Sequence, residues 1–170
     1  EIYSKNSDFD GVKLWNFLLE KGLPAGLMPS DVSSMHIRRI EAGILDYGTD
    51  IDQSLNPFEI GLDRLVHLDK FDFIGRKALM ETNHKSLRLK GLLCGEASLT
   101  RGDKLVDSGK EIGFVSAGAW SPYLESGVGL IRLNETKPSD HKVKVVTSSG
   151  EFDAKVVDLP LYDKEKLLVR

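Results

Sequence analysis

The chain has 170 residues, of which 41% are apolar and 29% are charged, a mixture that can form a packed core. Acidic side chains outnumber basic ones by 26 to 23, and the formal charge of −3 argues against a nucleic-acid-binding surface. The single cysteine, Cys94, excludes an internal disulfide framework and a cysteine-rich metal site. No apolar stretch reaches the roughly 18 residues of a membrane-spanning helix. Composition therefore predicts a soluble protein without nucleic-acid or membrane partners.

The beginning of the chain has the residue spacing of helices. Asp10 is a predicted N-cap, and the apolar residues that follow it recur on one stripe until Gly22, a typical helix stop. A second helix is predicted after Ser30, with Asp31 in its first turn, where a carboxylate suits the helix dipole. This second helix is expected to run towards Gly43.

Shorter helices are predicted over residues 56–65 and after Gly75, and short alternating runs then replace the helical spacing. These runs and two apolar, Gly-punctuated segments predict five or six strands, and five of them are placed at residues 87–93, 112–119, 128–133, 143–145 and 152–156. The last two flank a Ser-Ser-Gly turn, which is typical of a hairpin. Together the strands predict a small antiparallel barrel or a sandwich.

Arg39 is the most informative single position. At about 100° per residue, Arg39 falls within about 20° of Val32 and close to Met35, inside the apolar stripe of the second predicted helix. An uncompensated guanidinium there would cost several kcal/mol. Arg39 is therefore either half of a buried arginine–glutamate pair or a charged anchor in the floor of a pocket. His36 shares this face and is expected to be a hydrogen-bonding core residue.

Other candidate sites are weaker. The histidines share no metal-ligand spacing, so no metal site is predicted. The turn Trp120-Ser121-Pro122-Tyr123 carries two aromatic side chains, and such a turn either lines a pocket or packs on a neighbouring domain.

Several motifs, taken in order, resemble a known family. Arg39-Ile40-Glu41-Ala42-Gly43, followed by Tyr47-Gly48-Thr49-Asp50, resembles the RxEAG…YGxD signature of the aminomethyltransferase family, whose type member is the T-protein of the glycine cleavage system. Further segments are similar to later blocks of that family, at residues 56–62, 69–70, 72–79, 113–118, 121–122 and 159–163. The resemblance covers essentially the whole chain.

This resemblance implies an α+β fold class, with the C-terminal part of a folate-binding α+β domain followed by a small antiparallel β-barrel. Residues 1–85 would be the C-terminal part of the folate-binding aminomethyltransferase domain, and residues 86–170 the barrel. Family members are about twice this length, so an upstream half is expected to precede residue 1. The catalytic acid of the family lies in that half, and no catalytic residue is expected here.

The resemblance also implies a cofactor, tetrahydrofolate, and residues that contact it. Glu1 resembles the carboxylate that binds the N–H groups of the pterin ring, a planar donor pair that suits two parallel hydrogen bonds. Arg39 resembles an arginine that helps to hold the folate. Trp120 and Tyr162 are expected to approach the cofactor from the barrel, whereas Arg101 is expected to be structural.

The implied function is tetrahydrofolate-dependent transfer of an aminomethyl or methyl carbon from an amine to tetrahydrofolate. Implied partners are the upstream half and either a small-molecule amine or a lipoyl carrier protein, in the cytoplasm or, in a eukaryote, the mitochondrial matrix. Alternatives are the folate-binding half of a dimethylglycine or sarcosine dehydrogenase, a dimethylsulfoniopropionate demethylase, and a non-catalytic folate-binding module. An iron–sulfur maintenance role is disfavoured, because Cys94 lies outside the motif of those relatives.

Overall fold

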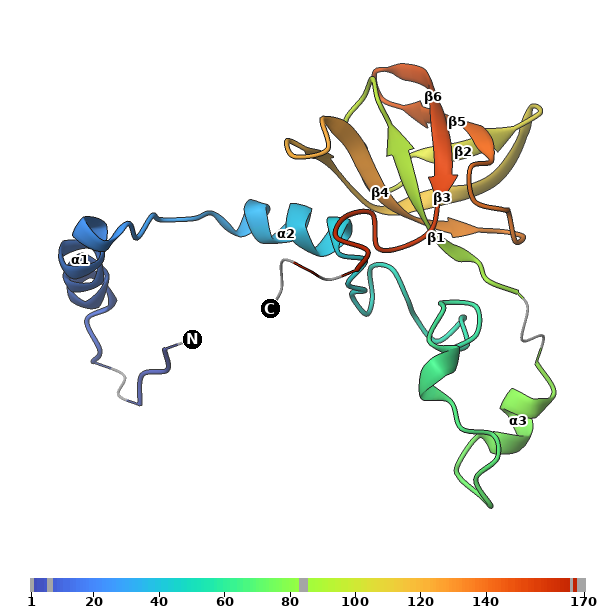
Figure 1. Cartoon of the computed structure of the whole chain (residues 1–170), viewed down its shortest axis with the longest axis horizontal. Helices are drawn as coiled ribbons and strands as arrows, with labels where there is room; N and C mark the ends of the chain where they lie inside the picture. Colours follow the sequence, from blue (N-terminus) through green and yellow to red (C-terminus); the bar gives the residue numbers. More distant parts are fainter. Residues whose placement is uncertain (1, 6–7, 83–85, 166, 168–170) are drawn as a thin grey trace. The chain divides into compact units, whose positions relative to one another are not determined.

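The computed structural model describes residues 2–5, 8–82, 86–165 and 167, and its elements follow one another as shown in Figure 1. The chain forms two compact units, residues 1–34 and residues 35–170. Glu1 lies outside the described residues. The predicted division between a folate-binding part and a barrel at residue 85 stays a prediction.

The first unit contains the helix α1 (Gly11–Gly22), which begins where its predicted cap places it. The Asp10 carboxylate accepts a hydrogen bond from the backbone N–H of Lys13 at 2.9 Å, which satisfies one of the donors that a helix leaves free at its start. A single 3-10 turn (Leu23–Ala25) follows, and Gly26 closes it in the left-handed region at φ 87°.

The helix α2 (Val32–Glu41) confirms the second predicted helix, but the role predicted for Asp31 was wrong. Asp31 precedes the helix, and its carboxylate accepts from the backbone N–H of Ser33 at 2.7 Å. It therefore acts as a cap on the free N–H groups instead of as a charge within the first turn. Burial increases towards the end of α2, where Ile40 and Glu41 are fully buried.

The helix predicted over residues 56–65 does not form. The Asn56 side chain accepts from the backbone N–H of Phe58, while Glu59 Oε2 accepts from Asn56 N and Nδ2, so local side-chain bonds close a turn that competes with helix. Only the 3-10 turn Asp63–Leu65 has helical character in this stretch. The short helix α3 (Arg76–Met80) follows Gly75 as predicted.

The second half of the chain is a closed six-stranded antiparallel barrel, which decides between the two predicted architectures. Its strands are β1 (Leu89–Cys94), β2 (Lys104–Asp107), β3 (Lys110–Ser121), β4 (Ser126–Leu133), β5 (Lys142–Thr147) and β6 (Gly150–Val157). They close in the order β1-β4-β3-β2-β5-β6. The predicted hairpin is β5–β6. The sequence pattern missed β2, because four residues are too few to show alternation.

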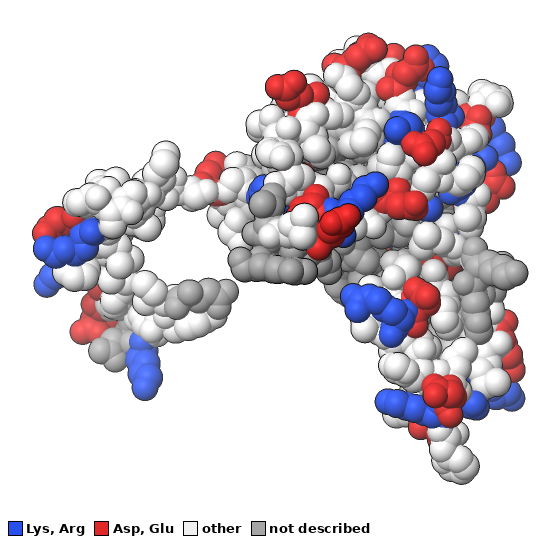
Figure 2. Space-filling view, viewed as in Figure 1, with Lys and Arg blue, Asp and Glu red and all other residues white. Residues whose placement is uncertain are grey.

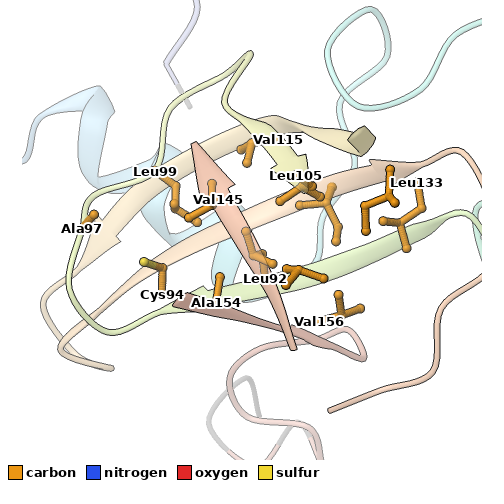
Figure 3. Close-up of a cluster of buried hydrophobic side chains, with 13 residues drawn as sticks. Leu92, Cys94, Ala97, Leu99, Leu105, Val115, Leu133, Val145, Ala154 and Val156 are labelled. Atoms are coloured by element: carbon orange, nitrogen blue, oxygen red, sulfur yellow. The ribbon is translucent and has the colours of Figure 1, made fainter. Parts of the chain in front are cut away.

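A β-bulge interrupts the long strand β3 at Ser116. Val115 pairs with Ile131 and Ala117 with Leu130, so Ser116 has no partner on β4. A bulge adds one residue to a strand and changes the direction in which side chains point. Three successive residues, Val115 to Ala117, are consequently all buried. Apolar side chains fill the barrel interior, and in Figure 3 Leu92, Leu105 and Val145 point towards one another.

Two arginines hold the segment that precedes the barrel. Arg132 Nη1 lies 2.7 Å from Asp52 Oδ2, and Arg88 Nη1 lies 3.3 Å from Glu59 Oε1.

On the face shown in Figure 2, basic and acidic side chains are interspersed over the surface. No helix within the described ranges combines the length and the apolar character that crossing a bilayer requires.

Replacing Gly127 by alanine should destabilise the barrel. A Cβ at this position of β4 would overlap the carbonyl oxygen of Ala97, and the backbone would have to move. We expect a loss of about 1–3 kcal/mol in the free energy of unfolding, measured by urea denaturation. Gly95→Ala is the matched control, because nothing lies within 4 Å of a Cβ there. Equal stability of the two variants would contradict the packing described.

Acid should weaken the link between β2 and the connection from β4 to β5. Asp107 accepts from His141 Nε2 at 2.8 Å and from Lys137 Nζ at 3.2 Å, and these partners lower the pKa of Asp107 to about 2. Because the pKa in the folded state is depressed, the stabilisation is present above about pH 4 and is lost as the pH falls towards about 2. Urea denaturation of Asp107→Asn should show a flatter pH dependence in this interval, and an unchanged slope would refute the link.

Candidate functional site

The candidate site is built on an ion pair between α2 and the turn that follows it. Arg39 Nη1 lies 2.7 Å from Asp50 Oδ2 and also donates to the carbonyl oxygen of Ile44 at 3.2 Å. The Asp50 side chain is fully buried, and that of Arg39 is 18% exposed. A buried carboxylate needs both a counter-charge and hydrogen bonds, and Arg39 supplies the charge.

Two further groups complete the environment of Asp50. The hydroxyl of Ser116 lies 2.7 Å from Asp50 Oδ1, and the backbone N–H of Asp46 donates to Oδ2 at 3.0 Å. Gly48, at φ 91°, allows the chain to turn so that residues 46 and 50 face each other. The bulge in β3 directs Ser116 to this carboxylate, so one buried group joins the helix, the turn and the barrel.

This arrangement corrects one prediction about Arg39. The carboxylate that it meets belongs to Asp50, not to a glutamate. The apolar stripe on which Arg39 was placed is not buried either, since Val32 is 78% exposed and Met35 70% exposed. The prediction that the Arg39 guanidinium needs a compensating partner is nevertheless confirmed, because Arg39 is largely buried by the turn that carries Asp50.

A cavity of about 320 Å³ lies beside the ion pair, near the lower end of the size range for ligand sites. Helix α2, the turn after it, the segment before β2 and strand β3 all contribute to its wall. Its lining residues are His36, Arg39, Asp46, Thr49, Arg101, Ser116, Ala117 and Gly118. The wall therefore carries cationic, anionic and hydroxyl groups side by side, a mixture that can orient a polar ligand.

A second polar contact fixes the end of α2 and the C-terminal segment. Glu41 is buried, its Oε1 accepts from the Ser121 hydroxyl at 2.6 Å, and its backbone carbonyl accepts from the N–H of Tyr162 at 3.1 Å. Arg38 lies over the Tyr162 ring at 5.4 Å, and Tyr123 meets that ring edge-on at 4.5 Å. Partial desolvation, and secondarily the Tyr123 hydroxyl, raise the pKa of Tyr162.

The structure brings only part of the predicted set together. Arg39 lines the cavity, whereas Trp120 and Tyr162 do not: Trp120 lies on β3 with 39% of its surface exposed, and Tyr162 packs on Arg38 and Tyr123. Glu1 lies outside the described residues. The cofactor contacts predicted for these four residues stay predictions.

Sequence reasoning missed several residues of the cavity wall. Asp46 and Thr49 adjoin or belong to the YGTD motif, whose spacing could have indicated a turn that closes on α2. Ser116 could not be found, because the bulge that directs it leaves no signature in the pattern. Arg101, read as structural, lies on the wall although 53 residues separate it from Gly48, whose carbonyl accepts from its Nη2 at 3.3 Å.

Comparisons with known proteins agree with this architecture. The GCVT N-terminal domain matches residues 1–70, and the glycine cleavage T-protein C-terminal barrel domain matches residues 88–163. An aminomethyltransferase of Koribacter versatilis is 34% identical over 171 residues, covering 98% of this chain and 45% of the relative. One from Thermotoga neapolitana is 36% identical over 157 residues, covering 88% and 42%.

A solved structure shows the same fold. The crystal structure of glycine cleavage system aminomethyltransferase T from Bartonella henselae superposes with a TM-score of 0.74 at 23% identity, covering 89% of this chain and 43% of that one. The chain belongs to the aminomethyltransferase family, since the two domain matches together span most of it and its curated relatives carry that name. It spans about half the length of the curated relatives it matches.

Removing the Asp50 carboxylate should strongly destabilise the unit formed by residues 35–170. Asp50→Ala leaves the largely buried Arg39 without its counter-charge, and we expect a loss of about 3–5 kcal/mol in urea denaturation. Asp153→Ala is the control, because the Asp153 side chain is 81% exposed and its pair with Lys144 is solvated; it should cost no more than about 1 kcal/mol. Similar losses for the two variants would show that Asp50 is not a structural anchor.

Proposed function

We propose that this chain takes part in tetrahydrofolate-dependent transfer of a one-carbon unit from an amine donor to tetrahydrofolate. The observation that carries the proposal is the contact between the two family motifs. Arg39 of the RIEAG segment and Asp50 of the YGTD segment form one ion pair, and the arginine of this pair lies on the wall of a polar cavity. Family membership supports the same reaction class.

The residues of the cavity are chemically suited to part of a folate. The Asp46 carboxylate can accept from N–H groups, and the guanidinium of Arg101 can bind a carboxylate. Ser116 Oγ and Arg39 are already engaged by Asp50, which leaves them rigid. Tetrahydrofolate, when bound, would supply the nitrogen that takes up the one-carbon unit.

The contribution of the chain itself would be to orient the ligand. Three of the four segments of the cavity wall, namely α2, the turn after it and β3, are held in one geometry by the buried Asp50 network, so their polar groups need little rearrangement to meet a ligand. Holding two reactants in a productive orientation can lower a barrier by roughly 7–11 kcal/mol. Glu1, Trp120 and Tyr162 are proposed to complete the folate contacts.

The amine donor and its carrier are further parts of the proposal. We place an aminomethyl group on a lipoyl carrier protein first, because the relatives of this chain are named aminomethyltransferases. A cytoplasmic location is part of the same proposal. Sequence shared with relatives about twice as long supports an upstream segment as the second wall of the site. Use of dimethylglycine as the donor would instead favour the dimethylglycine dehydrogenase-like alternative, and use of dimethylsulfoniopropionate would favour the demethylase-like alternative.

Isothermal titration calorimetry of the chain with 5-formyltetrahydrofolate tests the proposal. The chain should bind saturably, and Arg39→Ala should weaken binding by about 1.5–3 kcal/mol, the scale of a hydrogen bond to a charged group. Asp50→Asn separates ligand binding from folding, since it weakens the ion pair but keeps the guanidinium in the cavity. It should therefore lower stability and retain more affinity than Arg39→Ala. Absence of binding by the wild-type chain would contradict the proposal.

A further inference from the structure

Arg101 is a cation of the cavity wall that pairs with no carboxylate among the described residues. Its Nη2 donates to the carbonyl oxygen of Gly48 at 3.3 Å, and its side chain is exposed. Within residues 2–5, 8–82, 86–165 and 167, Arg101 makes no ion pair. The remaining N–H groups of its guanidinium are therefore free to meet a ligand.

Arg39, on the same wall, is in the opposite state. Its Nη1 is held by Asp50 and by the Ile44 carbonyl, and its charge balances a carboxylate that is fully buried. Moving Arg39 away from Asp50 towards a ligand would leave that buried carboxylate without its counter-charge, which is strongly unfavourable. Arg39 can therefore meet a ligand only from a fixed position, through the N–H groups that Asp50 and Ile44 leave open, whereas the Arg101 side chain can follow an anionic group without disturbing an existing ion pair.

We propose that Arg101 anchors a carboxylate of the ligand in this cavity, as a specificity residue of the proposed function on which this inference rests. A guanidinium presents paired N–H groups in the geometry that a carboxylate accepts. Thr49 Oγ1 donates to Asp46 at 2.6 Å, so this hydroxyl does not compete for the incoming anion. The carboxylate belongs either to the glutamyl group of a folate or to an amino-acid donor such as dimethylglycine.

Asp46 supplies the opposing charge that limits which anions enter. Its carboxylate lines the same cavity, and no cation pairs with it in the described part of the chain. A simple anion is attracted by Arg101 and repelled by Asp46, whereas a ligand with an N–H group can place that group at Asp46. The two side chains therefore predict opposite effects when each is neutralised.

Calorimetric titration of the chain with two ligands tests the inference. 5-Formyltetrahydrofolate carries the glutamyl group with its carboxylates, and the amide of 5-formyltetrahydropteroate lacks this group and has no carboxylate. The glutamyl group should improve the affinity of the wild type about tenfold, and Arg101→Ala should reduce this gain to under about threefold. Asp46→Asn, which keeps the Thr49 contact, should leave or increase the gain. Arg64→Ala removes an exposed arginine outside the cavity and should change nothing.

Dimethylglycine is titrated in parallel to identify the source of the carboxylate. A loss of dimethylglycine binding in Arg101→Ala, with no glutamyl effect, supports the anchor and assigns it to the donor. If Arg101→Ala binds all three ligands with the same affinities as Arg64→Ala, the inference is overturned, even when both folates bind. Failure of both folates to bind the wild type refutes the proposed function instead, and the dimethylglycine arm still reports on Arg101.

Discussion

The arrangement of residues 35–170 depends on one buried carboxylate. Asp50 forms an ion pair with Arg39 of helix α2 and accepts hydrogen bonds from the Ser116 hydroxyl of strand β3 and from the Asp46 N–H of its own turn. Because a carboxylate at this depth is costly unless all of these contacts form together, the network fixes helix, turn and barrel in one geometry. The polar cavity depends on this constraint, since three of the four segments of its wall are the ones that Asp50 joins.

Much of the fold could be predicted from local pattern. The cap of α1, the short helix after Gly75 and the alternation in β5 and β6 are each determined by neighbouring residues. The failures have non-local or competing causes. Residues 56–65 form a turn because Asn56 and Glu59 bond to the local backbone, and β2 is defined by its partners β3 and β5 instead of by its own four residues.

The candidate site, like the fold, was predictable only where local sequence determines it. Rotation around α2 showed that Arg39 needs a partner, yet its apolar neighbours on the helix are exposed and the partner comes from a turn 11 residues later. The contribution of Ser116 depends on a bulge, and that of Arg101 on closure of the barrel against the turn at Gly48. Such contacts between distant segments cannot be deduced from periodicity. They also show that the two arginines of the cavity differ: Arg39 is held in place by a buried carboxylate, whereas Arg101 makes no ion pair with any described residue.

The most direct test of the proposed site is a crystal structure of the chain with 5-formyltetrahydrofolate. Electron density for the ligand should lie in the cavity between α2 and β3, with a carboxylate against Arg101 and the Arg39–Asp50 pair unchanged. Density elsewhere on the barrel, or a broken Arg39–Asp50 pair with Arg39 turned to the ligand, would contradict the assignment of the cavity and of its two arginines.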